Sequence, residues 1–508
     1  MKLNQSLFFK KVFKSLNVFF VIVFLLASKL TLAQTTFPVN GPFDERPEVF
    51  ALTNAVITIA PGQVIENGTI VVKKGIIESV GQNVRIPENA VVYDIQGAHI
   101  YPSFIDLYTS YGIKEVSGER RSRRDGPQFL SDKKGAYGWN EAIKPEIRAH
   151  QIFHRDNDKA ESFRNQGFGA VLSHQEDGIA RGTGVFVSLA NKPDNEVILE
   201  DMASAHYSFD KGSSTQDYPG SLMGAIALIR QTYLDAEWYK NGGNEKEYNI
   251  SLDNWNKIQR LPQFFEITDW LSLLRAQRIA DEFNKNYIYV GSGDEYQRLE
   301  AIKNTGRPLV IPLKFPDAFD VSDPFDALNV SLADMMHWEM APSNAAYLEK
   351  HNIDFAISSH GLENINQFRK SLEKAIKHGL SKEAAMKALT TKPAEILGLE
   401  DKIGTLEKGK IANFLVTSGD IFDASTSIYQ NWIQGVSHKV TDYDFIDIRG
   451  TYELTLNDMR TFNLIIGGQA HKIDVKLQQD TIEKKIHFER KHFLISMMFE
   501  DPSATVEG

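Results

Sequence analysis

The stretch Tyr101-Pro-Ser-Phe-Ile-Asp-Leu-Tyr-Thr-Ser110 decides the fold. It reads as a short apolar strand that ends in polar residues just after Asp106, so it predicts a buried strand that delivers polar side chains to a site. Before it, residues 51 to 99 alternate as short strands, including a hairpin from Gly68 to Gly81 that turns near Lys74-Gly75. Short strands with turns at this spacing favour a small β-sandwich.

After Asp106 the pattern changes to strands that alternate with helices. The segments 167–173, 185–189, 263–267, 287–290, 308–312 and 354–357 are strand candidates, and 222–239, 271–283, 295–304, 345–351, 365–378 and 382–390 are helix candidates. Ser381 is a good N-cap for the last of these helices. We interpret Gly178 to Gly184 as a tight connection between two strands. The alternation predicts an α/β fold with a (β/α)₈ barrel of the TIM type.

Two motifs resemble the amidohydrolase superfamily. Its first barrel strand ends in P-G-F-I-D-x-H-x-H, and Pro102, Phe104, Ile105 and Asp106 match this pattern. Its tail motif, D-R-I-G-S-L-E-x-G-K-x-A-D-L-V-V, resembles residues 401–416, DKIGTLEKGKIANFLV, with asparagine at position 413. Residues 431–435 match the strand and turn that follow. The chain is therefore identified as a divergent member of the superfamily, similar to imidazolonepropionase-like metal-dependent hydrolases.

This resemblance implies the domain organisation. Residues 48–100 and 397–440 would form a composite β-sandwich, and residues 101–396 would form the barrel between its two parts. Residues 441–508 add a β-rich C-terminal segment. The tail, residues 501–508, is open-ended in pattern, so a longer two-domain architecture that was cut, or that lost its second half, is one expectation.

The first 33 residues predict a secretory signal peptide. Lysines gather before residue 15, and Val18 to Ala27 is an apolar run too short for a comfortable membrane span. Thr31-Leu-Ala33 supplies small residues for cleavage before Gln34, and an uncleaved anchor helix is the alternative. We therefore expect a secreted or periplasmic bacterial protein, with no membrane span after cleavage.

Composition excludes several function classes. The net charge of −10 makes nucleic acid an improbable partner. The absence of cysteine excludes disulfides, cysteine–zinc sites and a thiol nucleophile. The run Glu119 to Asp125 contains four arginines; a solvent-facing loop is the simpler interpretation, and a rim for an anionic ligand is the alternative.

The resemblance also implies a metal site that this sequence does not reproduce. Superfamily enzymes hold one or two divalent metals with two histidines after strand 1, histidines after strands 5 and 6, and an aspartate after strand 8. Tyr108 and Ser110 replace the first pair, and Glu266 takes the strand 5 position. His360 takes the place of the aspartate, and the chain contains no H-x-H triplet. A phenol is a poor zinc ligand beside imidazole.

A rewired site is the alternative to a lost one. Glu266 and His360 are the candidate catalytic residues, and His174 and Arg181 are candidate ligand-binding residues. An imidazole and a carboxylate could bind zinc or another divalent metal, or transfer protons. These side chains could equally be polar residues that fill an abandoned cavity. No other cofactor is indicated.

Three functions follow from these observations. The first is a non-catalytic companion of an active amidohydrolase homologue, or a homo-oligomer. The second is a hydrolase of carbon–nitrogen bonds in amides, cyclic imides or small peptides, with a rewired mononuclear site. The third is a surface protein that binds a carbohydrate, amide or peptide-like ligand, for which Tyr137, Trp139 and Trp338 are the motivating aromatics.

Overall fold

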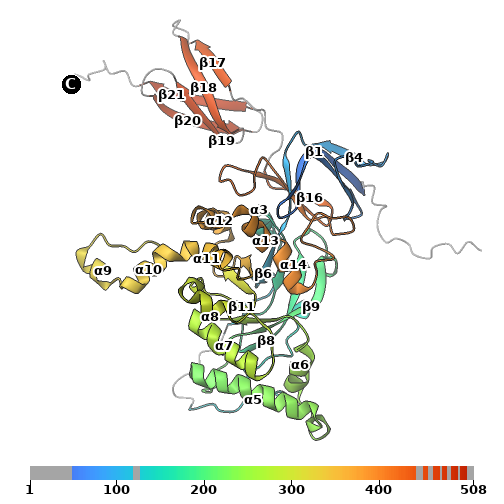
Figure 1. Ribbon diagram of the computed structural model, residues 1–508, viewed down its shortest axis with the longest axis vertical. Helices are drawn as coiled ribbons and strands as arrows, with labels where there is room; N and C mark the ends of the chain where they lie inside the picture. Colours follow the sequence, from blue (N-terminus) through green and yellow to red (C-terminus); the bar gives the residue numbers. More distant parts are fainter. Residues whose placement is uncertain are drawn as a thin grey trace, which may run out of the picture. The chain divides into compact units, whose positions relative to one another are not determined.

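The computed structural model describes residues 48–117, 126–441, 450–455, 461–469, 472–477, 482–489 and 492–499. The expected signal peptide, the whole arginine-rich run and the tail from Asp501 lie outside these residues. The described chain contains two eight-stranded sheets and two small antiparallel sheets (Figure 1). None of its described helices is both long and apolar enough to cross a bilayer.

The first eight-stranded sheet combines segments from before and after the barrel. Its strands are β1 (Val49–Ala60), β2 (Gln63–Lys73), β3 (Ile76–Gly81), β4 (Val91–Asp94), β5 (His99–Pro102), β14 (Phe414–Thr417), β15 (Ile428–Ile433) and β16 (Val436–Lys439). They pair in the order β16-β15-β14-β5-β1-β2-β3, and β4 pairs with β1. The sheet encloses an apolar core that includes Ile57, Ile70, Phe414 and Trp432.

The tail motif is the contact between the two parts of this sheet. Gly75, in the β2–β3 turn, accepts a hydrogen bond from the backbone N–H of Ala412 at 2.8 Å. Gly435, in the β15–β16 turn, lies against Gly75, and a Cβ added to Gly435 would lie 2.6 Å from the Cα of Gly75. Both positions have positive φ, so glycine is required for conformation as well as for space.

The second eight-stranded sheet is the barrel. Its strands are β6 (Phe104–Thr109), β7 (Phe168–Ser173), β8 (Ala180–Ser188), β9 (Ile198–Tyr207), β10 (Gln263–Glu266), β11 (Tyr287–Val290), β12 (Leu309–Pro312) and β13 (Phe355–Ser358). Neighbours in the sequence are neighbours in the sheet. Ser358 at the end of β13 donates to the carbonyl of Tyr108 on β6 at 3.3 Å, which brings the two edge strands together.

Strand β8 departs from the regular (β/α)₈ pattern. All other neighbouring pairs are parallel, whereas β8 runs antiparallel to both β7 and β9. The glycine-rich stretch was interpreted as a tight connection, and this was wrong: the chain turns at Gly178, and Ala180 already belongs to β8. Gly178 has φ +100°, and an added Cβ would lie 2.8 Å from the carbonyl oxygen of Ala142. The short reversal consequently points Arg181 into the barrel.

Helices follow most of the later strands. The described α-helices are α2 (Ala149–Ile152), α3 (Asn157–Asn165), α4 (Asp194–Val197), α5 (Leu222–Lys240), α6 (Ile250–Ile258), α7 (Trp270–Glu282), α8 (Leu299–Lys303), α9 (Pro324–Asn329), α10 (Leu332–Met340), α11 (Asn344–Lys350), α12 (Phe368–Lys377), α13 (Lys382–Leu389) and α14 (Thr391–Leu397). The Ser381 side chain accepts from the backbone N–H of Ala384, which confirms the predicted cap of α13. Strand β9 and helices α3, α6 and α14 were not anticipated.

The C-terminal strands form two further sheets. The first pairs β17 (Gly450–Thr455), β18 (Thr461–Gln469) and β19 (Lys472–Leu477), and the second pairs β20 (Ile482–Glu489) with β21 (His492–Phe499). All of these pairings are antiparallel.

Candidate functional site at the barrel mouth

Asp106 is the best-satisfied carboxylate in the barrel. It is fully buried, and one oxygen accepts from the backbone N–H of Tyr108 at 3.1 Å and from the Ser358 hydroxyl at 2.5 Å. The other oxygen accepts from the backbone N–H and the hydroxyl of Ser359, at 2.9 and 2.5 Å. Burial raises the pKa of Asp106, and the hydrogen bonds from Ser358 and Ser359 oppose that rise. Its role is to tie β6 to the end of β13.

Arg181 is the central cation of the mouth. Its guanidinium donates to the carbonyl of Gly178 at 3.0 Å, to the phenol oxygen of Tyr108 at 2.8 Å and to the hydroxyl of Ser208 at 3.0 Å. Its Nη1 also lies 2.6 Å from Oε2 of Glu266. Only 5% of the Arg181 side chain is exposed, so the guanidinium charge is held almost entirely by protein groups.

Glu266 and His360 complete this cluster. Nε2 of His360 lies 3.4 Å from Oε1 of Glu266, and the phenol of Tyr108 donates to Oε2 at 3.2 Å. Burial raises the pKa of Glu266, but the hydrogen bond from His360 and the charge of Arg181 outweigh it and lower the pKa to about 2. Burial lowers the pKa of His360, and its contact with Glu266 reverses that effect and raises the pKa above its usual value. Glu266 is therefore an anion that faces two cationic groups.

Glu176 lies at the edge of the same cluster. The residue is exposed to solvent at the surface. Desolvation by the neighbouring protein atoms nevertheless raises the pKa of its carboxyl, and the positive charge of His360 opposes this rise. It follows the buried His174 by two residues in the turn that leads to β8.

Two neutral histidines lie behind this ion-pair cluster. The rings of His174 and His206 stack face to face, with centroids 3.7 Å apart and planes at 6°, and Tyr108 packs on His174 at 4.4 Å. Burial, together with neighbouring positive charge, lowers the pKa of both histidines well below the usual value. His206 shares a 2.7 Å hydrogen bond with Ser204, whereas neither ring nitrogen of His174 has a hydrogen-bond partner among the described residues.

A divalent metal does not fit this arrangement. The guanidinium of Arg181 already lies beside the carboxylate of Glu266. A metal ion bound to the same carboxylate would be repelled by this positive charge. Because the rings of His174 and His206 are parallel and stacked, the lone pairs in their ring planes do not converge on one point. Across the described ranges, no group of three or more histidine, aspartate or glutamate side chains is placed to hold a metal ion.

The structure brings the candidate residues from the sequence together. Glu266, His360 and Arg181 are in direct contact or share one ion-pair network, and His174 is linked to them through the ring of Tyr108. Ser110 lies just after β6, partly buried, and its carbonyl accepts from the backbone N–H of Ile113.

Sequence reasoning missed three members of the site. His206 was missed because β9 was not predicted, and Ser208 was missed for the same reason. Glu176 was missed because it lies in a turn, where no strand-end pattern marks it. The signal that could have found His206 and Ser208 is the run from Ala203 to Ser208, a small-residue strand that ends in polar groups.

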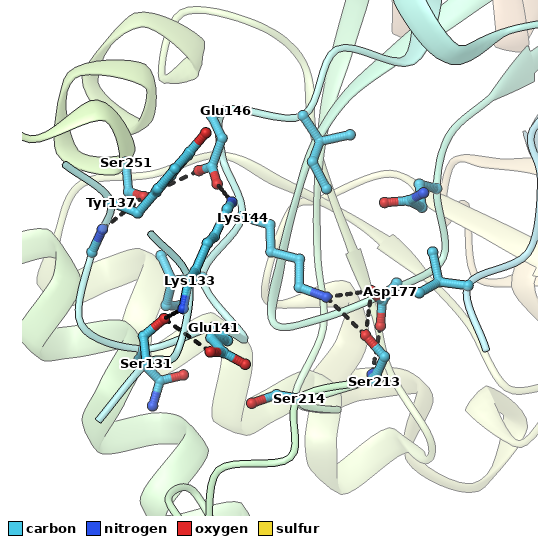
Figure 2. A pocket seen from close by; sticks show the side chains of 16 residues that line it. Ser131, Lys133, Tyr137, Glu141, Lys144, Glu146, Asp177, Ser213, Ser214 and Ser251 are labelled. Atoms are coloured by element: carbon cyan, nitrogen blue, oxygen red, sulfur yellow. Dashed lines mark hydrogen bonds and ion pairs between the residues drawn. The ribbon is translucent and has the colours of Figure 1, made fainter. Parts of the chain in front are cut away.

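A polar cavity of about 360 Å³ lies beside the turn that carries Glu176 (Figure 2). Its charged side chains are already paired: Lys144 with Asp177 and with the hydroxyl of Ser213, and Lys133 with Glu146 at 2.6 Å. The ammonium of Lys133 also lies 3.6 Å from the ring centroid of Tyr137.

Two of the three aromatics that motivated a carbohydrate-binding interpretation have a ring in contact with another group. The ring of Tyr137 faces Lys133, and Trp139 stacks on Tyr218 with ring centroids 5.9 Å apart. Trp338 belongs to α10, in a different part of the chain.

Comparison with known proteins gives a family match over part of the chain and a shared fold. A family model described as the amidohydrolase family matches residues 323–450. An amidohydrolase from Thermotoga maritima MSB8 has the same fold, with a TM-score of 0.60 and 23% identity over 76% of this chain and 99% of that one. Residues 323–450 thus match the amidohydrolase family, and the chain has the fold of an amidohydrolase.

Two further structures are similar at lower scores. A prolidase complexed with N-methylphosphonate-L-proline has a TM-score of 0.47 and 12% identity, covering 77% of this chain and 99% of that one. A β-aspartyl dipeptidase from Fervidobacterium islandicum AW-1 has a TM-score of 0.44 and 15% identity, covering 77% and 96%. We draw no inference from these two. A search of curated protein sequences found no match.

The chain thus has a barrel and a composite β-domain, in a fold similar to that of the Thermotoga maritima amidohydrolase. At the mouth of this barrel, Arg181, Glu266 and Tyr108 form one network centred on the arginine.

Proposed function

We propose that this protein is a non-catalytic member of the superfamily that acts as a companion of other polypeptides rather than as a hydrolase. The observation that carries the proposal is the position of Arg181, whose Nη1 lies 2.6 Å from Glu266 and whose guanidinium is held by three further groups. Residues 1–33 have the pattern of a secretory signal peptide, so the proposed role is outside the cytoplasm.

The protonation states at the mouth support the same conclusion. Hydrolysis of an amide requires a base that takes a proton from water at neutral pH. Glu266, with a pKa of about 2, is a weak base, and His360 has a raised pKa that favours its protonated form. His174 is neutral but fully buried, so water does not reach it from the mouth.

A hydrolase with a rewired site is the second candidate. The observation that favours it is that Glu266 and His360 keep 25% and 22% of their side chains exposed, so a substrate could touch both. In that case His360 would act as a general acid, and Glu266 would orient it.

One experiment separates the two candidates. The purified protein is assayed for hydrolysis of simple amides, cyclic imides and dipeptides, with added zinc and with chelator. His360→Ala is the test variant, and His378→Ala, an exposed histidine on the outside of the barrel, is the matched control. We expect no hydrolysis that depends on His360. Turnover that is lost in His360→Ala but retained in His378→Ala would overturn the proposal and establish the second candidate.

A further inference from the structure

Residues 317–339 form an apolar arm between β12 and α11. The arm contains α9 and nearly all of α10, and these helices extend away from the barrel strands (Figure 1). None of its residues is buried. Its exposed large apolar residues are Phe319, Val321, Phe325, Leu328, Leu332, Met335, Met336 and Trp338, and Leu328 and Phe325 are exposed by 81% and 78%.

The arm is built with local helix signals. The side chain of Asp323 accepts from the backbone N–H of Phe325 at 2.7 Å, which caps α9. The hydroxyl of Ser331 accepts from the backbone N–H of Asp334 at 3.1 Å, which caps α10. These caps specify where the helices begin, but helices of six and nine residues are not stable in water without tertiary packing.

Five apolar side chains of the arm recur at helical spacing on its two helices. Phe325 and Leu328 are three residues apart on α9, and Leu332, Met335 and Met336 recur at the helical spacing on α10. This is the pattern of a helix that packs against a core. The rest of the described chain supplies no such core, because no residue of either helix is buried.

The base of the arm is fixed to the barrel. The phenol of Tyr296 and Nδ1 of His337 are 3.1 Å apart, and the two rings stack with planes at 12°. Beyond this contact, Ala341 and Pro342 are buried. The arm is therefore presented from a defined position.

We propose that the arm packs against the arm of a second copy of this chain, around a twofold axis. Eight apolar side chains that each expose on the order of 100 Å² would bury about 800 Å² per copy, which is the amount that a standard interface buries on each partner. In a twofold dimer the same surface patch of each chain forms the interface, so the apolar face of one arm would contact that of the other. This inference is independent of the chemistry at the barrel mouth.

The charge of the arm makes the pairing dependent on salt. The arm carries six acidic residues and no lysine or arginine. In an arm-to-arm pair these carboxylates lie at the rim and repel one another, so added salt strengthens association. A basic partner protein would show the opposite dependence, because its attraction to the arm would be screened.

Sedimentation equilibrium on the full chain tests the proposal. The test variant is Phe325→Ser with Leu328→Ser. The matched control is Met223→Ser with Leu234→Ser on α5, where the side chains are 81% and 52% exposed. We expect a dimer for wild type and for the control, and a dissociation constant raised on the order of 100-fold for the arm variant. Circular dichroism checks that all three fold.

A thiol cross-link locates the interface. Because the chain has no cysteine, Asn329→Cys on the arm introduces a single thiol, and Glu237→Cys on α5 serves as its control. We expect a covalent dimer after mild oxidation of the Asn329→Cys chain and none for the control. A wild-type monomer at micromolar concentration would overturn the proposal, as would a dimer that survives the arm variant or weakens with added salt.

Discussion

The junction between the β-domain and the barrel differs from the barrel mouth in the side chains that hold it together. At the junction, Asn431 is fully buried, accepts from the Ser103 hydroxyl at 2.8 Å, and donates to the carbonyls of Phe168 and Arg164 at 2.9 and 3.1 Å. These contacts join β15 to the start of β6 and to β7. The mouth lies at the opposite ends of the barrel strands. There the side chains of Arg181, Glu266 and His360 form an ion-pair network.

This difference shows that the fold and its chemistry are specified by separate residues. The junction depends on glycine turns, a buried asparagine and apolar strands, none of which requires a metal. The mouth depends instead on charge, because the guanidinium of Arg181 pairs with the carboxylate of Glu266. A fold can therefore persist after its site has been rebuilt.

The largest expected effect concerns the junction side of this comparison. Trp432 is 2% exposed and packs on Phe50 and Phe414, with ring centroids 5.2 and 5.4 Å away. We expect Trp432→Ala to lower the unfolding free energy by about 4 kcal/mol, because it leaves a cavity in the β-domain core. Urea denaturation measures this. Tyr248→Ala, at a 66% exposed aromatic, is the control and should change the value by less than about 0.5 kcal/mol.

The next effect concerns the mouth. We expect Arg181→Met to lower the unfolding free energy by about 3 kcal/mol, because it leaves the Glu266 carboxylate without its closest cation. Adding Glu266→Gln to the same chain should restore most of that loss, because the charge to be compensated is gone. A double variant whose loss equals the sum of the two single losses would show that the two side chains are not coupled.

A third effect depends on acid. The pKa of Glu266 is about 2 in the folded chain against 4.5 normally, so its stabilising contribution is complete above pH 4.5 and is lost as pH falls toward 2. This shift corresponds to about 3 kcal/mol. The unfolding free energy of wild type should therefore fall more steeply than that of Glu266→Gln between pH 4.5 and about 2. Parallel acid profiles would contradict the assignment of the ion pair.

The smallest effect concerns the stacked histidines. Burial lowers the pKa of His174, so the unfolded chain binds more protons below pH 6.5, and stability falls there as pH decreases. His174→Phe should flatten this part of the profile. It should also raise the unfolding free energy at neutral pH by about 1 kcal/mol, because two unpaired nitrogens are removed. His378→Phe on the exposed surface should leave the profile unchanged.

The sequence predicted the junction better than the mouth. The match around Asp106 and the tail motif specify local strands and turns, so the barrel and the β-domain followed from them. The antiparallel direction of β8 was not predicted. The stretch from Gly178 to Gly184 was interpreted as a connection, because its glycines do not give the apolar pattern of a strand. As a result, the contact of Arg181 with Tyr108 and Glu266, which joins three distant segments, could not be predicted from spacing.

Residues that depart from the superfamily motif marked the candidate site in the sequence, although the residues that contact them did not. Tyr108, Glu266 and His360 were each found by a departure from the superfamily pattern, and they lie in one cluster. Arg181, which contacts Tyr108 and Glu266, and Ser208, which accepts from Arg181, match no motif, because a guanidinium network depends on tertiary geometry rather than on residue spacing.

Metal content tests the central claim most directly. The purified protein is exposed to zinc, dialysed gently and analysed for bound metal per chain, with folding checked by a cooperative thermal transition. We predict zinc well below one ion per chain in a folded protein, because Arg181 already compensates Glu266. Near-stoichiometric zinc that is lost in Glu266→Gln or His360→Ala would contradict the account and would show that the mouth is a working metal site.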